Sequence, residues 1–133
     1  MINFIYTIFF LVLAVPAASE VSFARLLHEN SFAKDRFFGG LEINLSLSQG
    51  VPYKISFLED PISLIIDFSI VRFDQIDLRK LNRSKNIKLI KVEELDSEWS
   101  RLSIQFKDYW TIDNTEMRID PSDGSAILSI SLK

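Results

Sequence analysis

The stretch Leu41-Glu42-Ile43-Asn44-Leu45-Ser46-Leu47 decides the fold class, because apolar and polar side chains alternate in it without a break. A period of two places the apolar side chains on one face of a β-strand and the polar side chains on the other. Gly39-Gly40 precedes the stretch and Gln49-Gly50 follows it, so turn-forming residues mark both of its ends. We therefore predict a strand over residues 41–47 with one buried face.

Similar patterns continue along the chain. Residues 51–57 form the next predicted strand, and the short connection from Ser48 to Val51 predicts a hairpin between the two strands. A turn at residues 59–61 is followed by residues 62–68, which are nearly all apolar apart from Asp67, as is typical of a central strand. We expect the remaining strands at residues 21–27, 87–95, 101–106, 110–112, 117–119 and 128–132, and a short helical turn within residues 72–86. For residues 21–27 the alternative is a helix.

These segments indicate an all-β protein. About eight short strands joined by tight turns, with no long amphipathic helix, predict a small β-sandwich of two antiparallel sheets. The first 19 residues stand apart because they carry no charged side chain, and an apolar run over residues 4–15 is followed by Pro16-Ala17-Ala18-Ser19. We interpret residues 1–19 as a signal peptide, the alternative being an uncleaved membrane anchor. The predicted domain then spans residues 20–133, and we expect it to be exported.

Composition excludes several functional classes. The chain has no cysteine and a single histidine, His28, and its formal net charge is −3. Disulfides, thiolate nucleophiles and zinc sites that need two imidazoles are therefore excluded, and we expect no metal, no cofactor and no catalytic residue. The mildly acidic balance also argues against a nucleic-acid partner.

Basic residues are concentrated in one segment without an intervening acid: Arg79, Lys80, Arg83, Lys85, Lys88 and Lys91. One interpretation is a cationic patch that meets an anionic polymer such as a cell-wall glycan with carboxylate-bearing peptides. The alternative is a solvated loop and edge strand. We single out Arg83, Lys85 and Lys88 as candidate binding residues.

A second set of candidates lies around the predicted strand at residues 101–106. Trp99 either stacks on sugar rings or covers one end of the core, and Arg101 follows it closely. Asp67 points away from its apolar neighbours on its strand, and we expect it to pair with a basic side chain such as Arg101 on the outer face.

Several segments carry a resemblance to a known family. Leu58-Glu59-Asp60-Pro61, followed by residues 64–68 with Asp67 among them, resembles the core signature of AMIN domains. Residues 99–102 and 117–124 are similar to the N-terminal part of alphaproteobacterial cell-wall amidases. The resemblance implies an exported sandwich of two small sheets that binds peptidoglycan, in which Leu58, Asp60, Pro61 and Asp67 are motif residues with structural roles.

The resemblance also implies a function. We expect a non-catalytic peptidoglycan-binding and targeting domain of a periplasmic N-acetylmuramoyl-L-alanine amidase, without the zinc catalytic domain in this chain. Its expected partners are peptidoglycan and a separate or downstream amidase catalytic domain or division proteins. The alternative is a protein-interaction module of an envelope assembly, of the kind found in secretin and pilus machinery.

Overall fold

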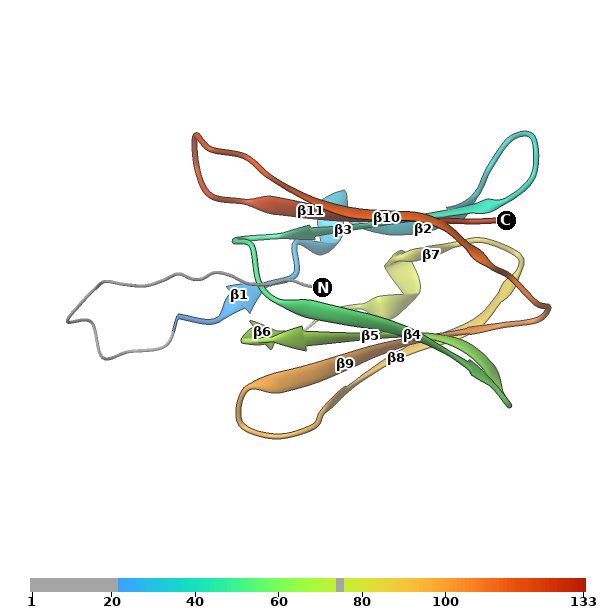
Figure 1. Ribbon diagram of the computed structural model, residues 1–133, viewed down its shortest axis with the longest axis horizontal. Helices are drawn as coiled ribbons and strands as arrows, with labels where there is room; N and C mark the ends of the chain where they lie inside the picture. Colours follow the sequence, from blue (N-terminus) through green and yellow to red (C-terminus); the bar gives the residue numbers. More distant parts are fainter. Residues whose placement is uncertain (1–21, 74–75) are drawn as a thin grey trace.

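Two sheets face each other across a hydrophobic core in the computed structural model, which describes residues 22–73 and 76–133 (Figure 1). The five-stranded sheet has the order β10-β11-β3-β2-β7, and the four-stranded sheet has the order β4-β5-β9-β8. The strands of the first are β10 (Ile112–Ile119), β11 (Ala126–Leu132), β3 (Leu41–Leu47), β2 (Phe32–Asp35) and β7 (Asn82–Arg83). The strands of the second are β4 (Tyr53–Glu59), β5 (Ile62–Ser69), β9 (Trp99–Phe106) and β8 (Ile87–Glu94).

Smaller elements complete the described part of the chain. Strands β1 (Ala24–Arg25) and β6 (Val71–Arg72) pair in parallel, and the short 3₁₀ helices are η2 (His28–Asn30) and η3 (Leu78–Lys80). The predicted signal peptide lies outside the described residues. Among the residues that are described, no helix is long and apolar enough to cross a bilayer.

The alternation in β3 builds the core as predicted. Leu41, Ile43, Leu45 and Leu47 are all at most 2% exposed. From the opposite sheet, Leu64, Ile66 and Phe68 of β5 are fully buried, since β5 is a central strand between β4 and β9. The apolar faces of the two sheets therefore cover each other, and the predicted all-β sandwich is confirmed.

The predicted hairpin between residues 41–47 and 51–57 is wrong. Both edges of β3 are occupied, by β2 on one side and β11 on the other, so β4 has no place beside it. The chain instead crosses from the five-stranded to the four-stranded sheet after β3 (Figure 1). Strand β4 pairs with β5 through the turn at Asp60-Pro61, which the sequence did predict.

The number and direction of the strands also differ from the prediction. Eleven strands are present in the described residues, more than the eight or so that we predicted. The short strands β2, β6 and β7 were not predicted because their sequences show no clear alternation of apolar and polar residues. The pairs β1–β6 and β2–β7 are parallel, whereas the other pairs of strands are antiparallel as expected. The predicted pieces at 110–112 and 117–119 are not separate strands, since β10 is continuous from Ile112 to Ile119.

Candidate functional site

The register of the four-stranded sheet gathers polar side chains on the face that points away from the core. Lys54 of β4 lies opposite Asp67 of β5, Asp67 lies opposite Arg101 of β9, and Arg101 lies opposite Glu93 of β8. We call these four residues the charged row. Their charges alternate in sign across the whole width of the sheet, which is the favourable arrangement for cross-strand neighbours.

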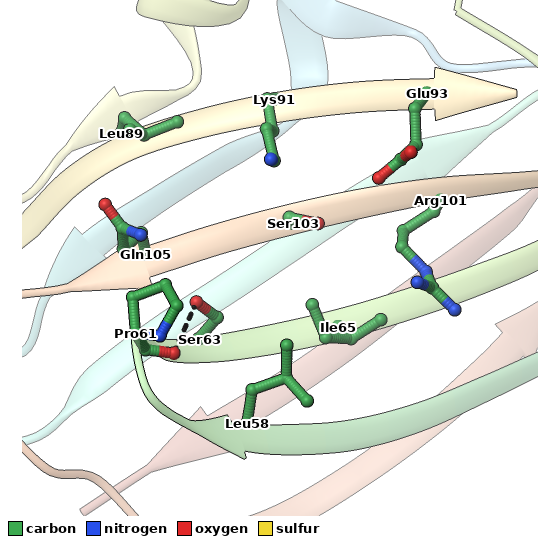
Figure 2. Close-up of a pocket in the computed structure, with 10 residues that line it drawn as sticks. All are labelled: Leu58, Pro61, Ser63, Ile65, Leu89, Lys91, Glu93, Arg101, Ser103 and Gln105. Carbon is green, nitrogen blue, oxygen red and sulfur yellow. Dashed lines mark hydrogen bonds between the residues drawn. The ribbon is translucent and has the colours of Figure 1, made fainter.

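Two further rows continue this outer face toward the β4–β5 turn. The first contains Ser56, Ile65, Ser103 and Lys91, and the second contains Leu58, Ser63, Gln105 and Leu89. A shallow pocket of about 170 Å³ opens over the three rows, and Figure 2 shows side chains from all four strands around it. Its lining comprises Leu58, Pro61, Ser63, Ile65, Leu89, Lys91, Glu93, Arg101, Ser103 and Gln105.

Asp67 and Arg101 form a bidentate ion pair in the middle of the charged row. Arg101 Nε donates to Asp67 Oδ1 at 2.7 Å, and its Nη2 donates to Oδ2 at 3.0 Å. The expected contact between these two residues is thus confirmed. The hydrogen bond to Asp67 raises the pKa of Arg101, so the guanidinium stays charged. The Asp67 side chain is only 16% exposed, which leaves Arg101 as the more accessible partner.

Trp99 lies at the start of β9 on the same face as Arg101, because the two residues are separated by two positions along the strand. It is half-buried, and the Nζ atom of Lys54 lies 4.8 Å from the centroid of its ring. Trp110, by contrast, packs against the core cluster, and Trp99 does not belong to that packing. Trp99 therefore lies on the outer face, and its stacking on sugar rings stays a prediction.

The cationic candidates do not form one patch with these residues. Arg83 belongs to β7 of the five-stranded sheet, and Lys85 follows in the connection to β8. Lys88 lies at a register shift near the start of β8, five residues before the Glu93 that lies opposite Arg101. At about 3.3 Å per residue, that separation is about 16 Å along the strand. Lys91, which the sequence analysis did not single out, is the member of the run that lines the pocket.

Three of the four family-motif residues, Leu58, Asp60 and Pro61, lie at the β4–β5 turn, whereas Asp67 belongs to the charged row. Asp60 and Pro61 form the turn between β4 and β5, and Ser63 Oγ donates to the Pro61 carbonyl at 3.0 Å (Figure 2). Leu58 and Pro61 also line the pocket, so the turn contributes to the surface as well as to the fold.

Sequence reasoning missed Lys54, Ser103 and Gln105. The alternation in residues 101–106 could have placed Ser103 and Gln105 on this face, but Lys54 required the register between β4 and β5.

The outer face offers groups that can bind a polar ligand. Within residues 22–73 and 76–133, no three His, Cys, Asp or Glu side chains lie together as a metal site would require. What the face does offer is an indole ring, cations and anions at fixed spacing, and hydroxyl and amide groups between them. Such a surface can hold a polar ligand that carries both charges and apolar ring faces.

A sequence model of the AMIN domain matches residues 36–130, more than two-thirds of the 133 residues. The matched range includes strands β3 to β10 and most of β11. A comparison with curated proteins finds no match. AMIN domains are non-catalytic modules that bind peptidoglycan. The chain belongs to the AMIN domain family.

Proposed function

We propose that this chain binds peptidoglycan through the outer face of the four-stranded sheet and thereby targets a protein to the cell wall. The observation that carries the proposal is the charged row beside Trp99, which puts an indole ring within reach of fixed cations on one exposed surface. Family membership supports the same ligand, since peptidoglycan binding is what AMIN domains do.

The chemistry of the face matches the parts of this polymer. The apolar face of Trp99 suits sugar rings, while Lys54 and Lys91 attract the carboxylates of stem peptides. Ser103 and Gln105 supply hydroxyl and amide groups for the hydroxyl and N-acetyl groups of the glycan. The Asp67–Arg101 pair holds the centre of the face in one geometry, so that the ligand meets a prearranged surface.

The wider context belongs to the same proposal. Resemblance to alphaproteobacterial cell-wall amidases supports a targeting role for an N-acetylmuramoyl-L-alanine amidase in the periplasm, with division proteins as further partners.

In this proposal residues 1–19 form a signal peptide and residues 20–133 form the exported domain. Mass spectrometry of the exported protein should give a mass that fits cleavage after Ala17 or Ser19. A mass that retains the whole apolar run would overturn this assignment.

Co-sedimentation with purified peptidoglycan sacculi tests the binding proposal. We expect the protein to sediment with sacculi, and we expect the double variant Lys54→Glu/Lys91→Glu to lose most of that binding at low salt. The matched control is Arg83→Glu/Lys85→Glu, which makes the same change in net charge away from this face. It should retain binding, apart from a general weakening that salt removes.

Three results of this experiment would change the proposal. If the unaltered protein stays in the supernatant, peptidoglycan binding is wrong for this chain. If the protein sediments and the Lys54/Lys91 variant sediments equally well, the outer face is the wrong site. Loss of binding in the control variant alone would move the site to the cationic segment around Arg83.

A further inference from the structure

The turn between β2 and β3 presents two phenylalanines entirely to solvent. Phe37 is 92% exposed and Phe38 is 94% exposed, and their rings meet edge to face with centroids 4.8 Å apart. Hydrogen bonds from Arg36 N to Gly40 O at 2.9 Å and from Gly39 N to Arg36 O at 3.3 Å close the turn. In Figure 1 this loop projects from the five-stranded sheet near the C-terminus. Two adjacent aromatic residues are thus held at a protruding tip without contributing to the core.

Cationic side chains surround the base of this tip. Lys34 lies opposite Arg83 in the β2–β7 pair, and both cations lie over the ring of Phe32, at 4.9 and 5.5 Å from its centroid. Arg36 directly precedes the two phenylalanines and is exposed.

Hydrogen bonds to Asp35 hold the connection between β7 and β8, which contains Lys85, at this base. The Asp35 carboxylate accepts hydrogen bonds from Ser84 Oγ, from Asn86 Nδ2 at 2.8 Å and from Lys85 N at 3.2 Å. The connection between β7 and β8 is thereby fixed beside β2. The Asp35 carboxylate is occupied by these donors, and Glu42 is a further acid that lies opposite Lys34 on β3. Exposed cations at and next to the base of the aromatic tip are Lys34, Arg36, Arg83 and Lys85.

We propose that the Phe37-Phe38 tip anchors the protein to a bilayer that contains anionic phospholipids. The two rings enter the boundary between headgroups and acyl chains, and Lys34, Arg36, Arg83 and Lys85 contact the phosphates. A bilayer is the occupant we favour because both rings are exposed at the end of the tip and basic side chains lie at its base. The surrounding charge is also complementary to anionic headgroups. This proposal goes beyond peptidoglycan binding and does not depend on it, because the tip and the outer face belong to different sheets.

Sedimentation with lipid vesicles tests the anchor. The probes are phosphatidylcholine vesicles with and without about a third phosphatidylglycerol, since anionic lipid is what the cations would recognise. We expect binding to the anionic vesicles, and we expect Phe37→Ser/Phe38→Ser to weaken it at least about tenfold, as removal of buried phenylalanine surface implies. Arg83→Glu/Lys85→Glu should weaken binding to anionic vesicles much more than any residual binding to neutral ones.

A matched control separates the tip from exposed apolar surface in general. Tyr109→Ser/Ile119→Ser removes two side chains that are 66% and 58% exposed elsewhere on the molecule, and it should leave vesicle binding unchanged. All proteins compared must have the same N-terminal residue by mass spectrometry, because the apolar segment at residues 4–15 would itself bind lipid. Equal thermal midpoints for the Phe37/Phe38 variant and the parent protein check that the variant is folded.

The outcomes distinguish this proposal from the proposed function. Failure of the parent protein to bind anionic vesicles overturns the anchor, and so does equal binding by the Phe37/Phe38 variant. If light scattering shows that the parent protein self-associates and the variant does not, the tip is a contact between copies and the anchor is wrong. Sacculus binding should be the same in the parent and the Phe37/Phe38 variant, whichever way the vesicle test turns out.

Discussion

The Asp67–Arg101 pair lies on the two central strands of the four-stranded sheet, so its removal should be measurable as a loss of stability. Asp67→Ala leaves the half-buried guanidinium without its bidentate acceptor. We expect a decrease in the free energy of unfolding of about 1–2 kcal/mol, after allowance for the partial exposure of Arg101. Urea denaturation of Asp67→Ala, Arg101→Ala and the double variant should give a clear coupling energy.

The same chain provides a control for that cycle. Asp77 and Arg79 also form an ion pair, with Nε to Oδ1 at 3.2 Å, but the Arg79 side chain is 91% exposed. Their cycle should show much weaker coupling, because exposed pairs gain little over hydration. Strict additivity of Asp67→Ala and Arg101→Ala would contradict the structural importance of the central pair.

Asp35 should make stability depend on acid pH. Desolvation raises the pKa of Asp35, but the hydrogen bonds from Ser84, Asn86 and Lys85 N outweigh it, so the pKa lies below its ordinary value. Above about pH 4 the carboxylate is ionised in both the folded and unfolded states, and its stabilising effect is fully present. As the pH falls below that value, the unfolded state binds the proton first, and the contribution is lost.

Urea midpoints measured between about pH 6 and pH 2.5 test this assignment. The parent protein should lose stability on acidification more steeply than Asp35→Asn, whose side chain cannot titrate. The comparison is needed because Asp77, Asp96 and Asp123 also have lowered pKa values and contribute to the acid sensitivity of both proteins. Identical slopes for the two proteins would show that Asp35 is not a source of the pH dependence.

At the scale of single elements, the turn between β2 and β3 depends on its two glycines. Gly39 and Gly40 have φ values of +95° and +94°, a region that other residues rarely adopt. Alanine at Gly40 would also place its Cβ 2.8 Å from the Leu132 carbonyl oxygen, whereas a Cβ at Gly39 meets no atom within 4 Å. We expect Gly39→Ala to cost about 1 kcal/mol or more, and Gly40→Ala to cost more than that. Thermal denaturation would contradict this account if it ranked the two variants in the opposite order.

Individual strands could be predicted from the sequence better than the pairing between them. Strand β3 matches its prediction at both ends because glycines bound a perfect alternation of residues. The pairing of β3 with β11 could not be predicted, since the two strands are far apart in the sequence and many strands share the same period-two pattern. Ile70 illustrates another limit. Its φ of +55° is unusual for a β-branched residue, and nothing in the sequence indicates it.

At the scale of the whole molecule, the sequence predicts only those members of the candidate face that a single strand makes visible. Trp99 and Arg101 were found because both belong to one strand, and Asp67 was found because it interrupts an apolar strand. Lys54 and Glu93 join them only through the order β4-β5-β9-β8, which brings four separate segments into one charged row. The run of basic residues shows the same limit, since residues close in sequence are divided between the two sheets and the connection between them, and their role in binding stays a prediction.

The shared core should make the two sheets unfold together. Leu45 and Leu128 of the five-stranded sheet and Ile66 and Leu102 of the four-stranded sheet are at most 2% exposed in one cluster. Neither sheet can cover its apolar face alone, so we expect a single two-state transition.

The two tryptophans test this expectation, because Trp99 lies on the outer face of β9 and Trp110 packs against the core near Phe106. The fluorescence of Trp99→Phe reports on Trp110, and that of Trp110→Phe reports on Trp99. In each variant, the urea midpoint from fluorescence should equal the midpoint from far-ultraviolet circular dichroism. Separate midpoints within either variant would show that the two sheets are independent units.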